Sequence, residues 1–77
     1  MEDRLKNIMS IVFEIDIDAI EPNSSPDNID NWDSIRHMLF ISALEDEFGV
    51  RFTDNQIIDV QSYQLALLTL KECGVTA

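Results

Sequence analysis

Cysteine, basic side chains and long apolar runs are scarce in this 77-residue sequence. Its single cysteine, Cys73, cannot form an internal disulfide, which excludes a small secreted domain held together by disulfides. No apolar run approaches the roughly 18 residues that a membrane-spanning helix needs. The first residues also lack the basic and then apolar segment of a signal peptide. We therefore expect a cytoplasmic protein with no membrane span.

Positive charge is also scarce, because five Lys and Arg residues stand against 15 Asp and Glu residues, for a net charge of −10. Nucleic acids and anionic membranes both need a basic face on the protein, so neither is expected as a partner. The excess of acid instead predicts partner proteins with basic surfaces. A chain this short has room for one hydrophobic core, which predicts a single domain over residues 1–77 and disfavours a deep active site.

The sequence also lacks the residues of a metal site. With one histidine and one cysteine, it cannot supply a cluster of His and Cys ligands. A calcium-binding EF-hand loop requires glycine at its sixth position. From the two plausible starts of such a loop, Asp16 and Asp27, that position holds Glu21 and Trp32. We therefore predict no metal centre.

Ser34 and His37 lie three residues apart, a spacing that brings two side chains together on a helix. A serine hydrolase also needs a group that orients the base and an oxyanion hole, and the sequence supplies neither. We therefore predict no catalytic residue. We expect His37 on an exposed helix surface or against a partner, and Cys73 packed at a helix end.

Apolar residues recur at helical spacing along the chain, which predicts an all-α fold. Capping side chains and glycines mark the ends of the helical segments. The expected fold is a small bundle of three longer helices and one short helix, with a long first loop. The predicted elements are a helix over residues 2–13, a helix from its cap Asp33 to Gly49, a short helix from Thr53 or Asp54 to Ile58, and a helix from its cap Ser62 to Gly74.

Residues 14–33 separate the first two helices and contain seven acids, both prolines and no Lys or Arg. Within this stretch, residues 14–18 alternate acidic and apolar side chains, as a strand would. No second strand follows to pair with it, so we predict a loop. Four isoleucines are expected to hold the loop against the core: Ile15, Ile17, Ile20 and Ile29.

The second helix is expected to bury one face. The residues assigned to the core are Phe40, Ile41, Leu44 and Phe48, together with Leu5, Ile8, Leu67 and Leu70. Glu45, Asp46 and Glu47 lie in the last turns, at the negative end of the helix dipole, where acids are unfavourable. They form either a solvated face or a contact with a partner.

Ser34 directly follows the cap Asp33, at the start of the second helix. Free backbone N–H groups and the positive end of the helix dipole favour a phosphate at such a position. The long preceding loop would let a modifying enzyme reach the hydroxyl. Physical chemistry thus predicts that Ser34 tolerates a phosphoester.

The segment Asp33-Ser34-Ile35, followed by LEDEFGVRF over residues 44–52, resembles the acyl carrier proteins and related thiolation domains. Length, acidity, helix order and the long first loop are also similar. The resemblance implies an acyl-carrier-like four-helix bundle that is not an enzyme. It also implies that a phosphopantetheinyl transferase attaches 4′-phosphopantetheine from coenzyme A to Ser34, with Asp33 as the helix cap of the motif. The thiol of this arm would carry acyl groups as thioesters.

By this resemblance the chain is a free-standing monomer that shuttles acyl intermediates between separate enzymes of fatty acid, polyketide or related specialised biosynthesis. Its extent, from Met1 to shortly after Gly74, is what we expect of an independent gene. Two alternatives stay open: a peptidyl or aminoacyl carrier of a nonribosomal pathway, and a small acidic, non-catalytic interaction module. Asp33 directly before Ser34 favours the acyl type.

The second helix would also dock partner enzymes. Ile35, Met38 and Ser42 recur at helical spacing and form a predicted docking stripe, in which the adaptable Met38 suits several partners. Glu45 and Glu47 would meet basic residues on acyl-loading and acyl-processing enzymes, which speeds encounter and keeps affinity modest.

Some residues depart from the family pattern. Trp32 stands where many carriers have a small residue, and Arg36 and His37 add positive charge to a helix that is usually acidic. These differences predict a distinct set of partners. Farther along, three apolar residues either gate an acyl pocket or fill the core: Ile57, Ile58 and Val60.

Overall fold

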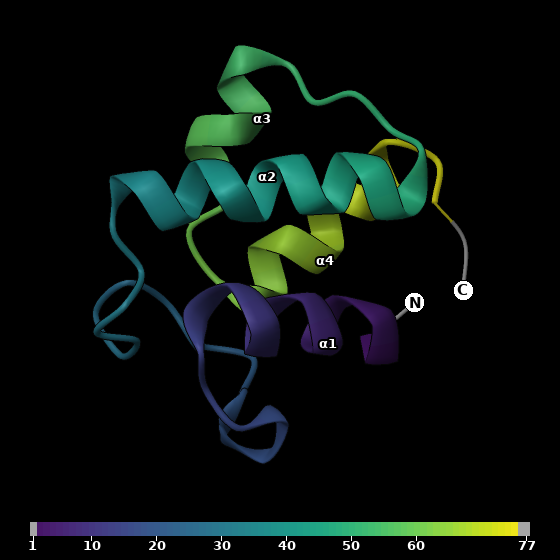
Figure 1. The fold of residues 1–77 in the computed structure, drawn as a ribbon. Helices are drawn as coiled ribbons and strands as arrows, with labels where there is room; N and C mark the ends of the chain where they lie inside the picture. The colour runs from purple at the N-terminus through teal and green to yellow at the C-terminus, as the bar shows by residue number, and fades with distance from the viewer. Residues whose placement is uncertain (1, 76–77) are drawn as a thin grey trace.

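The computed structural model describes residues 2–75, which form four α-helices and one turn of 3₁₀ helix (Figure 1). No residue from 2 to 75 lies in a β-strand, so the all-α prediction is confirmed. Residues 1, 76 and 77 of the predicted 1–77 domain lie outside this description. The elements are α1 (Glu2–Phe13), η1 (Ile17–Ala19), α2 (Ser34–Phe48), α3 (Asp54–Asp59) and α4 (Tyr63–Glu72).

Side-chain caps begin α2, α3 and α4, as the sequence predicts. The Asp33 carboxylate accepts a hydrogen bond from the Arg36 N–H at 2.8 Å. Ser62 Oγ accepts one from the third residue of α4 at 3.0 Å. Of the two predicted starts for α3, Thr53 is the cap, and its reciprocal hydrogen bonds with Gln56 form a capping box.

Two glycines follow the ends of α2 and α4. Gly49 has a φ of +64°, and its N–H donates to the Glu45 carbonyl. Gly74 has a φ of +90°, and its N–H donates to the Lys71 carbonyl at 3.0 Å. Glycine enters this left-handed region without the steric penalty of a side chain, which explains both predicted helix ends.

Aromatic rings fill the core where the end of α1 meets α2. The rings of Phe13 and Trp32 stack with centroids 4.5 Å apart, and Phe40 lies 5.3 Å from Phe13 and 5.6 Å from Trp32. All three are buried, although the sequence analysis assigned only Phe40 to the core. Of the other residues predicted there, Leu5, Ile41, Leu44 and Leu70 are buried, whereas Ile8, Phe48 and Leu67 are partly buried and pack against the core.

The long loop is held to the core by some of its predicted isoleucines. Ile20 and Ile29 are buried, and Ile15 is partly buried against the core. The prediction for Ile17 is wrong, because this residue is 39% exposed. Ile17 begins the 3₁₀ turn η1, none of whose residues is buried.

Backbone hydrogen bonds also tie this loop to the start of α4. The Tyr63 N–H donates to the Ser24 carbonyl at 2.9 Å, and the Gln64 N–H donates to the Pro22 carbonyl at 3.1 Å. The buried Ser24 hydroxyl accepts a hydrogen bond from the Glu21 N–H at 2.8 Å. A loop of this length is therefore ordered by polar contacts as well as by apolar burial.

Helices α1 and α2 run antiparallel (Figure 1). Arg4, near the start of α1, forms an ion pair with Glu47, near the end of α2, at 2.7 Å. At the other end, Arg36 Nη1 donates to the Val12 carbonyl at 2.6 Å. This arrangement brings the carboxyl end of α1 to the amino end of α2, where Ser34 lies.

Candidate functional site at the start of α2

Ser34 is the first residue of α2, and its side chain is exposed. Asp33, the residue before it, is extended with φ −107° and ψ −176° and caps the helix. The hydroxyl therefore lies at the amino end of the helix, close to its first backbone N–H groups and the positive end of its dipole. This is the environment predicted for a residue that bears a phosphoester.

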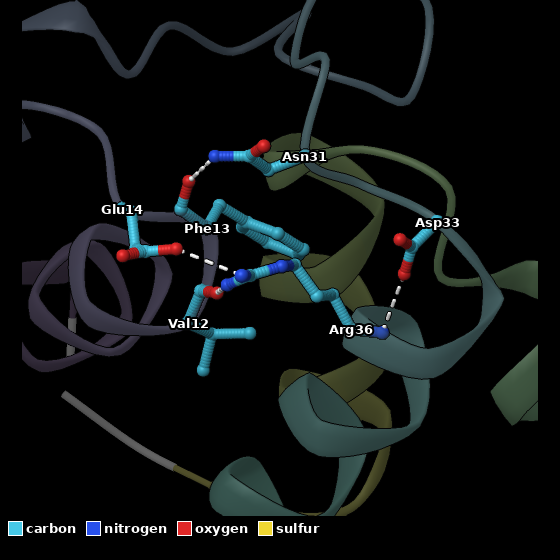
Figure 2. Close-up of polar contacts among 6 residues, drawn as sticks. All are labelled: Val12, Phe13, Glu14, Asn31, Asp33 and Arg36. Atoms are coloured by element: carbon cyan, nitrogen blue, oxygen red, sulfur yellow. Dashed lines mark hydrogen bonds and ion pairs between the residues drawn. The ribbon is translucent and has the colours of Figure 1, made fainter.

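The residues on both sides of Ser34 are bonded to the end of α1 (Figure 2). Arg36 donates through Nη1 to the Val12 carbonyl at 2.6 Å and through Nη2 to Glu14 Oε2 at 2.7 Å. Asn31 Nδ2 donates to the Phe13 carbonyl at 2.8 Å. Ser34 thus lies in a turn whose two flanks are anchored to one helix end.

The end of α1 provides carbonyls for these contacts because of how the helix stops. Glu14 has a φ of +54°, so the chain turns back there. The Ile15 N–H then donates a hydrogen bond to the Ser10 carbonyl at 3.2 Å. The last carbonyls, those of Val12 and Phe13, then lack partners within the helix. The Arg36 guanidinium satisfies one of them and places positive charge at the negative end of the dipole.

The positive charge that Arg36 adds to α2 lies close to α1, and its effect on the choice of partners stays a prediction. Its guanidinium is directed to Val12 and Glu14, and its side chain is 33% exposed. The guanidinium therefore makes contacts within the protein, because the last carbonyls of α1 lie beside it and need hydrogen-bond donors.

The expectation that His37 lies on an exposed surface is wrong. His37 is half-buried, with Nδ1 3.0 Å from Trp32 Nε1 and Nε2 2.8 Å from the Ile57 carbonyl. An indole N–H is only a donor, so Nδ1 accepts and Nε2 carries the hydrogen that is donated to Ile57. A neutral imidazole therefore joins the long loop, α2 and the end of α3. A buried tryptophan needs an acceptor for its N–H, and this requirement is the signal that the sequence analysis missed.

The structure also shows what surrounds His37 and Cys73, the single histidine and the single cysteine of the sequence. Both ring nitrogens of His37 are engaged away from Ser34, which leaves no base for the serine-hydrolase arrangement. Cys73 is half-buried after α4, and Sγ lies 3.9 Å from Gln56 Oε1, as expected for a packing residue.

A groove of about 510 Å³ lies beside Ser34, between the start of α2 and α3. Ile57 and Ile58 line it, which favours a place for them in the groove wall over simple core filling. Val60 is fully buried and belongs to the core. The full lining consists of Pro26, Trp32, Asp33, Ser34, His37, Met38, Ile57, Ile58 and Gln61.

The apolar part of the predicted docking stripe faces solvent. Ile35 is 74% exposed, Met38 is 51% exposed, and Ser42 is also exposed. Leu39, which the sequence analysis did not include, is 55% exposed on the same helix. The start and middle of α2 therefore carry an exposed apolar surface next to Ser34.

The two acids of the predicted docking surface have partners within the chain. Glu45 Oε2 accepts a hydrogen bond from the Phe52 N–H at 2.9 Å, which holds the segment after α2. Glu47 pairs with Arg4, whose Nη2 also donates to the Glu47 carbonyl at 2.7 Å. Their contact with partner enzymes stays a prediction.

Residues 2–75 contain neither a metal cluster nor a membrane-spanning helix. No group of three or more His, Cys, Asp or Glu side chains in this part of the chain is arranged to hold a metal ion. Over the same residues, no helix has the length and apolarity needed to cross a membrane.

Comparison with known proteins identifies the family. Residues 3–65 match the PP-binding family, described as a phosphopantetheine attachment site. The acyl carrier protein of Lactobacillus acidophilus (strain ATCC 700396 / NCK56 / N2 / NCFM) is 32% identical over 68 residues, which cover 88% of this chain and 85% of that protein. The chain therefore belongs to the phosphopantetheine-attachment family as a distant homologue of acyl carrier proteins, and it is a carrier rather than an enzyme.

Proposed function

We propose that this chain is a free-standing acyl carrier protein whose 4′-phosphopantetheine is attached to Ser34. It would carry acyl intermediates as thioesters between separate cytoplasmic enzymes of fatty acid, polyketide or related specialised biosynthesis. It would act as a monomer, with one carrier domain over residues 1–77. The observation that supports Ser34 is its exposed hydroxyl at the capped start of α2, beside the groove.

The attachment step needs little from the carrier itself. A phosphopantetheinyl transferase would take the proton of the Ser34 hydroxyl, form the bond from its oxygen to phosphorus, and release the adenosine bisphosphate portion of coenzyme A. The bound arm supplies a terminal thiol for thioester formation. The chain supplies a positioned hydroxyl, since Asp33 caps the helix and Arg36 and Asn31 hold the turn. The N–H groups at the helix start suit the resulting phosphodiester.

Docking would use the exposed face of α2. Ile35 and Met38 are exposed near Ser34 and would form the apolar contact, and the exposed Ser42 would extend it farther along the helix. Glu45 and Glu47 would attract basic residues of the transferase and of pathway enzymes. A small contact with charged groups at its rim permits the fast release that a shuttle requires.

Attachment can be tested by intact-mass measurement. The apo protein is incubated with coenzyme A, Mg²⁺ and a broad-specificity phosphopantetheinyl transferase. We expect wild type to gain the mass of one phosphopantetheine and Ser34→Ala to gain none. Ser25→Ala is the matched control, because it removes a serine hydroxyl from the loop before α2, outside the proposed docking surface, and it should be modified like wild type.

An unmodified wild type, or a modified Ser34→Ala, would contradict the proposal. The alternative of an acidic interaction module predicts that partner binding is indifferent to Ser34→Ala. An aminoacyl carrier predicts that the arm is loaded by an amino-acid-activating enzyme instead of an acyl-loading one.

A further inference from the structure

The inner wall of the groove beside Ser34 is a polar bridge between three elements. The Trp32 indole N–H donates to His37 Nδ1 at 3.0 Å, and His37 Nε2–H donates to the Ile57 carbonyl at 2.8 Å. The imidazole also lies nearly parallel to the indole, with ring centroids 6.1 Å apart and planes inclined by 21°. Loop, α2 and α3 are thus joined along the side of the groove that faces the core.

Behind this wall, aromatic side chains fill the interior of the bundle. Phe40 packs against the edge of the Trp32 indole, and Phe13 stacks on its face. Phe13 and Phe40 are fully buried. The imidazole stacks beside the indole where both line the groove, so a long apolar chain that entered the bundle past His37 would have to displace it.

Displacing the imidazole would break both hydrogen bonds at once. The indole N–H of Trp32 would lose its acceptor, and the Ile57 carbonyl would lose its donor. Both groups lie on half-buried or buried residues, where a polar group without a partner is costly. The gain from burying part of an acyl chain must first overcome this loss.

The outer side of the groove offers a different environment. Met38 and Ile58 line it and are 51% and 66% exposed. A short acyl group at the end of the arm can contact these side chains. A longer chain would extend past them into solvent, where it gains little burial.

We propose that the Trp32–His37–Ile57 bridge closes the groove toward the core and makes this carrier selective for short acyl groups, which it holds at the surface. This inference rests on the proposed attachment of the arm to Ser34. His37 is the specificity-determining residue, because its side chain supplies both halves of the bridge.

The test compares carriers loaded with cargo of different length. A phosphopantetheinyl transferase transfers acetyl- or decanoyl-pantetheine phosphate from the matching acyl coenzyme A, and intact mass verifies loading. The melting temperature is then measured, since cargo that binds only the folded state stabilises it. For wild type we expect the decanoyl form to melt within about 1 °C of the acetyl form.

His37→Ala should behave differently. The indole already lines the groove, and removing the imidazole leaves apolar space beside it, so decanoyl should raise the melting temperature by roughly 4 °C or more over acetyl. His37→Gln is the matched control, because a carboxamide both accepts and donates, and it should retain the wild-type result. A wild type stabilised by decanoyl as strongly as His37→Ala overturns the inference. So does a His37→Ala that gains nothing from decanoyl.

A second measurement uses wild type alone, and it tests the closed groove even where His37→Ala does not fold. We expect the NMR signal and hydrogen-exchange protection of the Trp32 indole N–H to be the same in the acetyl and decanoyl forms. Loss of protection in the decanoyl form overturns the inference. Failure to load any arm would instead count against Ser34 attachment, so the two proposals fail in distinguishable ways.

Discussion

The two ends of α2 are held by different kinds of interaction. At its start, Arg36 and His37 make hydrogen bonds to backbone carbonyls of other elements, and Asp33 caps the helix. At its end, Arg4 forms an ion pair with Glu47 and also donates to the Glu47 carbonyl, and the side chains of Glu47 and Arg4 are 44% and 52% exposed. The contacts of Arg36 and His37 with these carbonyls are partly buried, whereas exposed polar contacts contribute less to stability and weaken in salt. We therefore expect the helix start, with the proposed attachment site, to be more rigid than the charged end.

Truncation of an aromatic side chain should show the largest contrast between these regions. Phe40 is fully buried against Phe13 and Trp32, so Phe40→Ala should lower the free energy of unfolding by about 3–5 kcal/mol. Phe48 is partly buried beneath the Arg4 guanidinium, 4.5 Å from its ring centroid, and Phe48→Ala should cost about 1–3 kcal/mol. Urea unfolding measures both, and equal losses would contradict the contrast.

The two arginines that join α1 to α2 allow a matched comparison. Arg36→Ala should lower the free energy of unfolding by about 1–3 kcal/mol, because it leaves the Val12 carbonyl without its partner. It should also slow the modification of Ser34 roughly tenfold, since the turn that bears the hydroxyl is less well positioned. Intact mass against time gives the rate.

Arg4→Ala is the control at the other end of α2. Arg4 pairs with Glu47, donates to its carbonyl and lies over the Phe48 ring, but these contacts are exposed, so we expect a loss of about 1 kcal/mol and little change in the modification rate. If both variants slow modification alike, the anchoring of the helix start is not what positions Ser34.

The charged end can be tested by removing charge without removing acceptors. Glu45→Gln keeps an oxygen for the Phe52 N–H, so the double variant Glu45→Gln, Glu47→Gln mainly changes electrostatics. We expect severalfold slower modification at low salt and a smaller difference at high salt. Equal slowing at all salt concentrations would mean that attraction of the partner is not the cause.

The smallest effect concerns α4, which holds the loop before Ser34. Burial, followed by the charge and hydrogen bond of Glu2, raises the pKa of Tyr63 from 10.0 to about 12. Because the folded chain keeps this proton longer than the unfolded chain, stability should be unaffected below about pH 10 and fall as the pH rises toward 12. Tyrosinate absorbance follows Tyr63 alone, since it is the single tyrosine, and Tyr63→Phe should flatten the decline.

Local signals explain why the helix boundaries could be predicted from sequence. Asp33, Ser62 and Gly49 act on residues three or four positions away, and all three lie where expected. Ser34 could be singled out for the same reason, because its neighbourhood depends on a cap directly beside it.

The surroundings of Ser34 depend on contacts between distant parts of the chain, which pattern and spacing do not reveal. Arg36 contacts a carbonyl 24 residues away, and His37 contacts one 20 residues away. From the helical pattern alone, both side chains are expected to be exposed and to add positive charge to the helix. The fold places the end of α1 beside Arg36 and the end of α3 beside His37. The carbonyls at these two helix ends accept their hydrogen bonds and draw both side chains toward the protein.

The single tryptophan of this protein lies buried in the wall beneath the proposed attachment point. Its emission therefore reports on that one spot, without a dye and without interference from a second indole. Attachment of the proposed arm to Ser34 would change the surroundings of this natural optical probe, because the indole lines the groove beside the serine. The kinetics of that step would thereby be open to stopped-flow measurement on the unlabelled chain.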